Sequence, residues 1–247
     1  MILAAGLGTR LRPLTNDRPK ALVEVAGRTL LEITLQRLRS AGVHEVIVNA
    51  HHFADQVQDY VARLSGLGMR IEISREEELL DTGGGLKRAA WFFLENNSNE
   101  PFLLHNVDVL STIDVGAMMR FHRDRGALAT LAVQDRATSR YLLFDQDGLL
   151  CGRRPGRDGA AEMARAADGV QPLAFAGIHV ISPRIFDRLD ESGAFSIIDC
   201  YLRLAAQGEP ITAFRADGFY WRDLGKAESL AAAERETKLW RGVQLRP

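Results

Sequence analysis

The chain has 247 residues, 46% of them hydrophobic, which suffices for one large core or for one domain with a smaller lobe. Its 31 basic and 32 acidic side chains leave a net charge of -1, which excludes a global field for nucleic acid or an anionic membrane. No apolar run approaches the roughly 20 residues that span a bilayer, and two cysteines, Cys151 and Cys200, are too few for a disulfide framework. We therefore expect a reduced, cytoplasmic protein with no nucleic-acid or membrane partner.

A short apolar run opens the chain, and a loop rich in glycine and basic residues follows it. We expect Met1–Ala5 to form a buried strand, after which Gly6 and Gly8 let the backbone turn sharply and bring its N–H groups against phosphate oxygens. Positive charge then comes from Arg10, Arg12, Arg18 and Lys20. Strand, glycine loop and cations in this order indicate a nucleoside triphosphate site.

Two better-known glycine loops do not fit this segment. A dinucleotide-binding loop needs a third small residue where this chain has Leu11, which argues against a nicotinamide-dependent oxidoreductase. A P-loop needs Gly-Lys-Ser or Gly-Lys-Thr, and the chain contains neither. The opening segment is therefore a phosphate-binding loop of another kind.

Helical and strand patterns alternate through the first half, which predicts a mainly parallel sheet covered by helices. Ligands of such sheets bind beyond the carboxyl ends of the strands, so we expect the loops Gly6–Lys20 and Asn106–Leu110 to meet at one edge. A second glycine loop, Leu80–Gly85, precedes the third helix. The expected helices are Thr29–Ala41, Asp55–Leu64 and Leu86–Glu95, and the expected strands are Glu45–Ala50, Met69–Ser74 and Phe102–His105.

The second half changes character, because its strands are closer together and can pair in mixed or antiparallel fashion. Asp147-Gly148 predicts a hairpin turn, and Cys151–Gln171 has so little apolar periodicity that we expect a mobile loop. The expected strands are Leu128–Val133, Tyr141–Phe144, Leu173–Ile181 and Ile211–Arg215, and the expected helices are Ser196–Ala206 and Lys226–Leu239.

The opening motif carries a family resemblance. LAAGLGTRLRPLT, followed four residues later by Pro19-Lys20, resembles the signature of the sugar-1-phosphate nucleotidyltransferases, also called nucleotide-sugar pyrophosphorylases. The resemblance implies the α/β nucleotide-diphospho-sugar transferase fold: a Rossmann-like mixed, mainly parallel sheet flanked by helices, with a small sugar-binding lobe. It implies one domain over 1–247, with a nucleotide-binding half at 1–127, a sugar-binding half at 128–225 and a C-terminal helix at 226–247.

Nucleotidyl transfer brings two anions together, because a sugar 1-phosphate oxygen displaces pyrophosphate from the α-phosphorus of a nucleoside triphosphate. The reaction needs cations, a divalent metal that bridges phosphates, and carboxylates that hold the metal. The strand Phe102–His105 delivers Asp108 to the edge of the sheet, although Val107 replaces the glycine that relatives usually have. Asp223 lies in Trp221–Gly225, which resembles the family's late W-x-D-x-G motif. We expect both carboxylates to bind Mg²⁺.

The resemblance also assigns the remaining site residues. It implies that Arg10 and Lys20 are catalytic, holding the β/γ-phosphates and the reacting phosphates respectively. It places Asn106 and Gly177 against the sugar. The nucleotide-binding residues that it implies are Leu3, Ala4, Ala5, Gly6, Gly8, Thr9, Gly83 and Gly84.

Several other polar residues do not need a chemical role. Phosphate oxygen is an adequate nucleophile without a general base, so we expect His51, His52 and His105 to be structural. We expect Glu76–Glu78 to form a solvated turn rather than a metal site.

The substrates are less sharply indicated than the reaction. The short chain, the LAAG opening and the TGGG loop look most like the uridylyltransferases of cell-wall recycling that act on N-acetylmuramate 1-phosphate, so UTP is the expected donor. A guanylyltransferase for mannose- or heptose-1-phosphate, or a cytidylyltransferase, would keep the chemistry and change the substrates. A catalytically silent regulatory subunit that binds nucleotide sugar is an alternative of another class.

Overall fold

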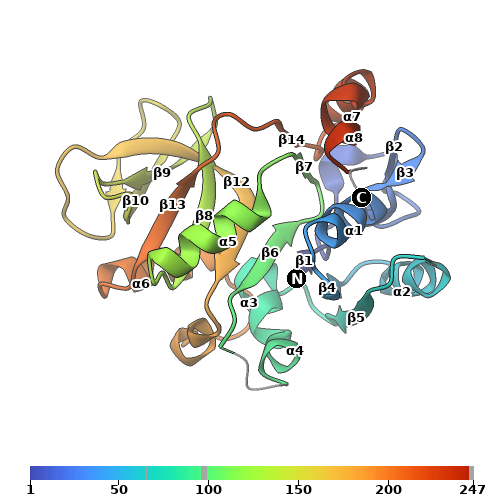
Figure 1. Cartoon of the computed structure of the whole chain (residues 1–247), viewed down its shortest axis with the longest axis horizontal. Helices are drawn as coiled ribbons and strands as arrows, with labels where there is room; N and C mark the ends of the chain where they lie inside the picture. Colours follow the sequence, from blue (N-terminus) through green and yellow to red (C-terminus); the bar gives the residue numbers. More distant parts are fainter. Residues whose placement is uncertain (65, 96–98, 245–247) are drawn as a thin grey trace. The chain divides into compact units, whose positions relative to one another are not determined.

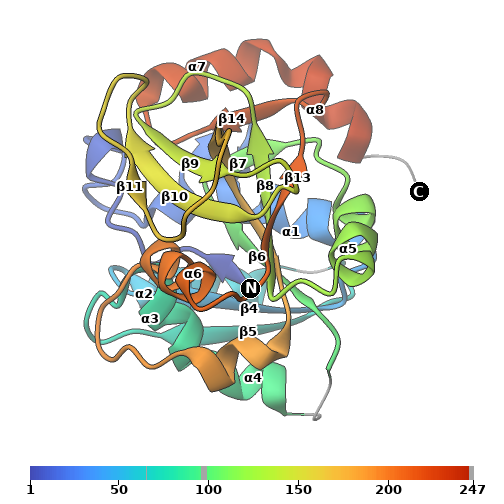
Figure 2. The same ribbon diagram turned by 90° about the vertical axis from the view of Figure 1, so that its left-hand side faces the viewer.

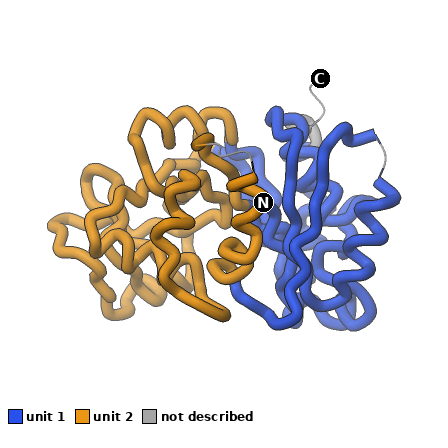
Figure 3. Tube along the Cα trace, turned by 90° about the horizontal axis from the view of Figure 1, so that it is seen from below, with its two compact units in different colours: residues 1–81, 105–113, 219–247 blue, residues 82–104, 114–218 orange. Residues whose placement is uncertain are grey.

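The computed structural model describes residues 1–64, 66–95 and 99–244 (Figure 1). The chain forms two compact units, each built from separate stretches of sequence (Figure 3). The first unit comprises Met1–Asp81, His105–Ile113 and Phe219–Pro247. The second comprises Thr82–Leu104 and Asp114–Gly218.

The first unit contains three strands that run parallel, together with the end of a fourth. Strand β1 (Ile2–Leu3) pairs in parallel with β4 (Glu45–Ala50) and with the end of β6 (Phe102–Asn106), and β4 pairs in parallel with β5 (Arg70–Arg75). Leu3 therefore lies in one register row with Asn49 and Asn106. The carboxyl ends of the strands meet at one edge, as the alternating pattern predicts.

Helix α1 (Leu30–Ser40) begins and ends within one residue of its predicted bounds, because both ends carry clear sequence signals. The side chain of Thr29 caps its N-terminus by accepting a hydrogen bond from the Glu32 N–H, and Gly42 adopts a positive φ just beyond its end. Helix α2 (Ala54–Arg63) also lies close to its expected position. The expected C-terminal helix is divided into α7 (Ala227–Arg235) and α8 (Thr237–Gln244), because it is interrupted at Glu236.

Short elements that the sequence pattern did not predict complete the first unit. They include the single-turn 3₁₀ helices Thr9–Leu11 and Lys20–Leu22, which fold the opening loop. Strands β2 (Glu24–Val25) and β3 (Arg28–Thr29) form a hairpin, and β7 (Val109–Ser111) pairs antiparallel with β14 (Trp221–Asp223).

The second unit contains a mainly antiparallel set of strands. Asp147-Gly148 forms the predicted hairpin turn, with Gly148 at φ +76°. The expectation of a loop over Cys151–Gln171 is wrong for two parts of this segment: residues 152–155 pair with the preceding strand, and Glu162–Met163 pair with Gly152 and Arg153. The strands are β8 (Ala129–Gln134), β9 (Arg140–Phe144), β10 (Leu150–Pro155), β11 (Glu162–Met163), β12 (Gln171–Ile181) and β13 (Ile211–Arg215), and β13 pairs with β8 in parallel.

Helices cover this second set of strands from both sides. Figure 2 shows α5 (Val115–Asp124) and α6 (Ile197–Ala206) on opposite sides of β8 and β13. The glycines expected in a loop before Leu86 instead form the first turns of α3 (Asp81–Arg88), which α4 (Ala90–Leu94) follows. The prediction of a single helix over Leu86–Glu95 is therefore wrong in its start and in its continuity.

The expected fold class is confirmed: a mixed sheet of parallel and antiparallel strands is flanked by helices. Both cysteines are fully buried free thiols. Across the described residues, no helix combines the length and apolar character that a membrane span requires.

Candidate active site

The opening loop is folded against the Pro19-Lys20 segment. Gly8 has φ +63°, and a Cβ at this position would lie 3.0 Å from the Lys20 Cβ and 3.0 Å from the Thr15 Cγ2. Its carbonyl accepts hydrogen bonds from the Thr15 hydroxyl and from the Leu11 N–H, both at 2.9 Å. Only glycine combines this backbone conformation with so close an approach. The absence of a side chain at Gly8 therefore allows Lys20 to pack against this turn.

Lys20 and Asp108 form an ion pair that links the opening motif to the end of β6. The Lys20 Nζ donates to the Asp108 Oδ2, and the two side chains are only 13% and 14% exposed. Partial burial weakens solvent screening, so each charge depends on the other more than in a surface pair. Two residues predicted from separate motifs thus meet in the first unit.

The short β7–β14 ladder brings the second predicted carboxylate to the same place. Asp223 stands opposite Val109, next to Asp108, and the Leu224 N–H donates to the Asp108 carbonyl at 2.8 Å. The Asp223 Oδ1 accepts the Gly225 N–H at 2.6 Å, which orients the carboxylate. Asp108 and Asp223, 115 positions apart in sequence, are therefore neighbours by backbone pairing.

Arg10 reaches this cluster through Gly225. A Cβ on Gly225 would lie 2.7 Å from the Arg10 Nη2 and 2.7 Å from the Asp223 Oδ1. The absence of a side chain at Gly225 is therefore what leaves room for the guanidinium group. The first unit brings together the four charged residues predicted for catalysis and metal binding, Arg10, Lys20, Asp108 and Asp223.

A buried polar network supports the end of β1. The Asn49 Oδ1 accepts the Ala4 N–H at 2.7 Å, and the Asn49 Nδ2 donates to the Glu76 Oε1 at 2.6 Å. The Glu76 Oε2 in turn accepts the Leu80 N–H at 3.1 Å. Glu76 is 2% exposed, so the expectation of a solvated turn is wrong for this residue. An asparagine among the apolar residues of β4 was the sequence signal for this network.

The other nucleotide-binding residues predicted in the first unit differ in accessibility. Ala4 and Ala5 are buried, and the Ala4 N–H is already bonded to Asn49. Gly6 and Thr9 are exposed, and the open space around Gly6 extends at least 4 Å from the position of a Cβ. Gly6 and Thr9 are thus the members of this set that a ligand could reach most easily.

Gly83 and Gly84 belong to the second unit, where they pack against Phe195. Both N–H groups point at the Phe195 carbonyl, at 2.9 Å and 3.3 Å, and a Cβ on Gly83 would lie 2.3 Å from the Phe195 ring. The Thr82 hydroxyl accepts the Ile197 N–H at 3.0 Å. These contacts explain the glycines by packing, and contact with a nucleotide remains a prediction. Sequence reasoning did not identify Phe195.

Gly177 occupies an irregular position in β12. Its φ is +74°, and the pairing of β12 with β8 shifts register between Phe175 and His179. Such a bulge leaves the backbone groups of the extra residue outside the ladder, where they are available to a ligand. Contact between Gly177 and a sugar stays a prediction.

His105, which is buried, and His51, which is half-buried, both contact backbone carbonyls. The His105 Nδ1 lies 2.8 Å from the Asn106 carbonyl, and burial, with the nearby charge of Arg37, lowers the pKa of His105 to about 3. The His51 Nδ1 lies 3.0 Å from the Glu76 carbonyl. Among the described residues, neither ring forms a hydrogen bond with Arg10, Lys20, Asp108 or Asp223. That these histidines are only structural stays a prediction.

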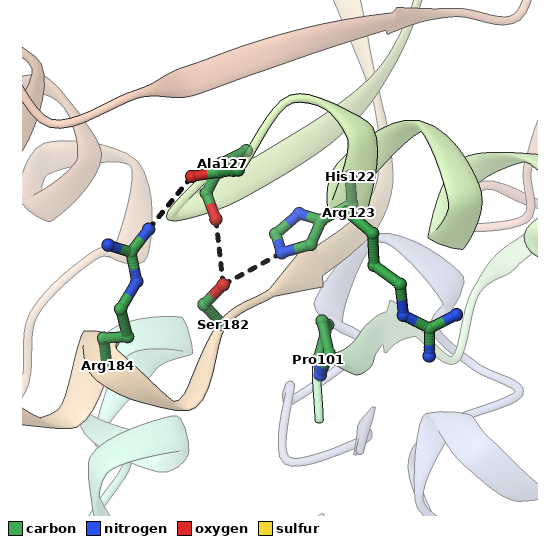
Figure 4. A pocket seen from close by; sticks show the side chains of 7 residues that line it. Pro101, His122, Arg123, Ala127, Ser182 and Arg184 are labelled. Atoms are coloured by element: carbon green, nitrogen blue, oxygen red, sulfur yellow. Dashed lines mark hydrogen bonds between the residues drawn. The ribbon is translucent and has the colours of Figure 1, made fainter. Parts of the chain in front are cut away.

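A pocket of about 300 Å³ in the second unit contains none of the predicted site residues. Its walls include His122, which contacts the Ser182 hydroxyl at 3.0 Å (Figure 4). His122 also contacts the Thr130 hydroxyl at 2.9 Å. Arg123 and Arg184 lie on opposite sides of His122 and point away from each other (Figure 4). Because the two guanidinium groups do not converge, we assign the pocket no ligand.

Known proteins provide the decisive comparison for this arrangement. Residues 1–238 match the family model described as "Nucleotidyl transferase". The chain belongs to the nucleotidyl transferase family. It is 37% identical to N-acetylmuramate alpha-1-phosphate uridylyltransferase of Caulobacter vibrioides, over 95% of this chain and 94% of that protein. It is 27% identical to UTP--glucose-1-phosphate uridylyltransferase of Synechocystis, over 92% of this chain and 60% of that protein.

Solved structures support the fold of this nucleotidyl transferase. HddC from Yersinia pseudotuberculosis superposes with a TM-score of 0.76 at 22% identity, over 96% of this chain and 97% of that protein. A second structure of HddC, complexed with GMP-PN, matches equally well. The resemblance to sugar-1-phosphate nucleotidyltransferases, inferred from the opening motif, is confirmed.

Proposed function

We propose that this protein transfers a uridylyl group from UTP to N-acetylmuramate 1-phosphate and releases pyrophosphate. The observation that carries the proposal is the meeting of Arg10, Lys20, Asp108 and Asp223 in one unit of a nucleotidyl transferase chain. The choice of base and sugar is supported by 37% identity to a uridylyltransferase of that sugar phosphate along nearly the whole of both chains.

The proposed reaction is a direct displacement. An oxygen of the sugar phosphate forms a bond to the α-phosphorus of UTP, the bond from that phosphorus to the β-phosphate oxygen breaks, and pyrophosphate leaves with the electron pair. Arg10 can hold two oxygens of the triphosphate with its planar fork. Lys20 supplies a compact charge that offsets repulsion between the reacting phosphates.

The ion pair with Asp108 gives Lys20 a defined starting position. It holds the ammonium group at the carboxyl edge of the parallel strands, where nucleotides bind in such sheets. A substrate phosphate oxygen can replace the carboxylate as the partner of Lys20, so the ammonium group keeps an anionic partner. The partly buried carboxylate of Asp108 then needs another cation, which fits its proposed role as a metal ligand.

The two carboxylates fit Mg²⁺. Among the described residues, no group of three or more His, Cys, Asp or Glu side chains is arranged as a metal site. Magnesium nevertheless needs only one or two protein carboxylates, because it keeps several waters and takes substrate phosphates as further ligands. The hydrogen bonds that the described residues make to Asp108 and Asp223 each use one carboxylate oxygen. The remaining oxygens are hard donors of the kind that this cation prefers, and the bound ion would neutralise phosphate charge.

Pyrophosphate release tests the proposal. Purified protein with Mg²⁺ is assayed with five nucleoside triphosphates against N-acetylmuramate, N-acetylglucosamine, glucose, mannose and heptose 1-phosphates, and the Asp108→Asn variant serves as the control. Release with UTP and N-acetylmuramate 1-phosphate that Asp108→Asn abolishes is the expected result. Selective use of GTP with mannose or heptose phosphate would replace the proposal by the guanylyltransferase alternative. Nucleotide-sugar binding without release for any pair would favour the regulatory subunit.

A further inference from the structure

One row of side chains crosses the strands of the second unit. Arg154 of β10 stands opposite Tyr141 of β9, Tyr141 stands opposite Ala174 of β12, and Ala174 stands opposite Gln134 of β8. Side chains directly opposite each other share one face of a sheet, and successive residues alternate between faces. Arg154 and Tyr141 therefore share a face, whereas Arg153 projects from the other one.

The two neighbouring arginines differ in how their charges are balanced. Arg153 forms ion pairs with Glu162, at 2.7 Å, and with Asp199 of α6. Arg154 instead lies with its Cζ 5.8 Å from the centroid of the Tyr141 ring. Its Nε is buried and has no hydrogen-bond partner. The charge of Arg153 is thus balanced by two carboxylates, whereas Arg154 forms no ion pair within the part of the chain that the structure describes.

A second arginine adds charge beside the first. The Arg157 Nε contacts the Tyr141 hydroxyl at 3.5 Å, and this contact is the main reason why the pKa of Tyr141 lies below its usual value. None of the ion pairs formed by the described residues includes Arg154 or Arg157. The pKa of Arg157 is raised first by its contact with Tyr141 and then by the nearby charges of Asp135 and Asp158. Neither of these described carboxylates forms an ion pair with it, so the two guanidinium groups around this phenol lack the paired carboxylates that balance Arg153. Such an arrangement favours an external anion.

A third arginine connects this cluster to the bulge in β12. The Arg136 Nη2 donates to the Phe175 carbonyl at 2.8 Å. Phe175 begins the register shift that contains Gly177, the residue predicted to contact the sugar. Thr130 of β8 lies four residues before Gln134, so the two side chains share a face of the sheet. His122 of α5 contacts Thr130, which places α5 on that face, farther along the strand. The cluster and the predicted sugar contact thus lie at one end of the same strands.

We propose that Arg154, together with Arg157 and Arg136, forms a subsite for a carboxylate carried by the acceptor sugar. The inference rests on the proposed function and extends it, because it states which chemical group makes an acceptor preferred: an acidic substituent in addition to the 1-phosphate. N-acetylmuramate 1-phosphate carries such a carboxylate on its lactyl ether, and N-acetylglucosamine 1-phosphate is the same sugar without it. An arginine side chain binds a carboxylate by two parallel hydrogen bonds. A neutral sugar would leave the positive charge of the arginines without an anionic partner.

The pair of sugars that differ by the lactyl group isolates this contact. Steady-state kcat/KM with UTP is measured for both acceptors in the wild type, Arg154→Met, Arg154→Lys and Arg153→Met. Arg154→Met should lower kcat/KM for N-acetylmuramate 1-phosphate roughly 10- to 100-fold, chiefly through KM, and leave that for N-acetylglucosamine 1-phosphate nearly unchanged. Arg154→Lys should recover part of the loss because it retains the charge without the fork. Arg153→Met, next in the chain but on the other face, should leave the ratio between the acceptors at its wild-type value.

The outcomes separate this inference from the proposed function. One outcome is that the wild type turns over N-acetylmuramate 1-phosphate while Arg154→Met keeps the wild-type ratio of kcat/KM between the two acceptors. That result overturns the subsite and leaves the proposed function in place. An equal loss for both acceptors also overturns it, since the cluster would then serve the common phosphate or the fold. Wild-type turnover of neutral sugars alone contradicts the proposed function itself.

Discussion

The close approach of Arg10 to Gly225 predicts the effect of adding a single methyl group at this glycine. In Gly225→Ala the new Cβ would lie 2.7 Å from both the Arg10 Nη2 and the Asp223 Oδ1, whereas ordinary contacts begin near 3.4 Å. One or both groups must therefore move by about 0.7 Å. The Asp223 Oδ1 is held by the N–H of Gly225 itself at 2.6 Å, so most of the displacement should fall on the flexible arginine.

The effect should appear in turnover and not in folding. Gly225 does not have a positive φ, so alanine is compatible with its backbone conformation. Alanine also restricts the unfolded chain, which should stabilise the folded protein by about 0.4–1 kcal/mol and offset the local crowding. A misplacement of about 1 Å can cost on the order of 10²-fold in rate, so kcat should fall roughly 10- to 100-fold. The assay is pyrophosphate release at saturating UTP and sugar 1-phosphate, with a thermal unfolding curve for each protein.

Gly218→Ala provides the matched control. A Cβ at Gly218 meets nothing within 4 Å, and the residue does not have a positive φ, so turnover and unfolding should match the wild type. Wild-type kcat in Gly225→Ala would refute the argument that this glycine sets the position of Arg10. A large fall in melting temperature in that variant would refute it equally, because the cost would then be structural.

Four further changes test other parts of the structure. Asp223→Ala should abolish Mg²⁺-dependent turnover and leave the far-ultraviolet circular dichroism unchanged; normal turnover would remove Asp223 from the site. Glu76→Gln should lower the free energy of unfolding in urea by about 1–3 kcal/mol, because an amide NH₂ replaces one of two buried oxygens that accept N–H groups; an unchanged midpoint would contradict the network. Gly83→Ala should cost about 1–3 kcal/mol through overlap with Phe195, and adding Phe195→Ala should reduce that penalty; additive costs would argue against the overlap. Burial first, and then neighbouring arginine charge, lowers the pKa of His122 to about 4 from 6.5, so its stabilising contribution is complete above about pH 6.5 and is lost as the pH falls toward 4. His122→Asn should therefore unfold with a flatter pH dependence between 6.5 and 4, and a parallel dependence would contradict this assignment.

The charged cluster could be predicted because each of its members belongs to a motif with a chemical reason. Arg10 and Lys20 follow a glycine loop, and Asp108 follows a buried strand, so the rules of parallel sheets place them at one edge. Helices with strong signals, such as α1 with its threonine cap, were predictable to within a residue or two.

The errors arise where tertiary contacts override local pattern. Glycines predict a loop at Gly83 and Gly84, but the Phe195 ring and carbonyl need bare backbone at the start of a helix. The segment after Cys151 lacks apolar alternation because β10 carries an arginine on each face, Arg153 on one and Arg154 on the other. Pairing with β9 is what makes this segment a strand. The β7–β14 ladder is too short for a pattern, and no local signal could have shown that it pairs Asp223 with Val109, next to Asp108.

Transfer of label from UTP tests the central claim most directly. UTP carrying ³²P at the α-phosphate is incubated with the protein, Mg²⁺ and N-acetylmuramate 1-phosphate, and the products are separated by chromatography. The account predicts that the label moves into a UDP-sugar while unlabelled pyrophosphate is released in equal amount, and that Asp223→Ala stops both. Label that stays in UTP, or that appears as UMP without nucleotide sugar, would contradict it.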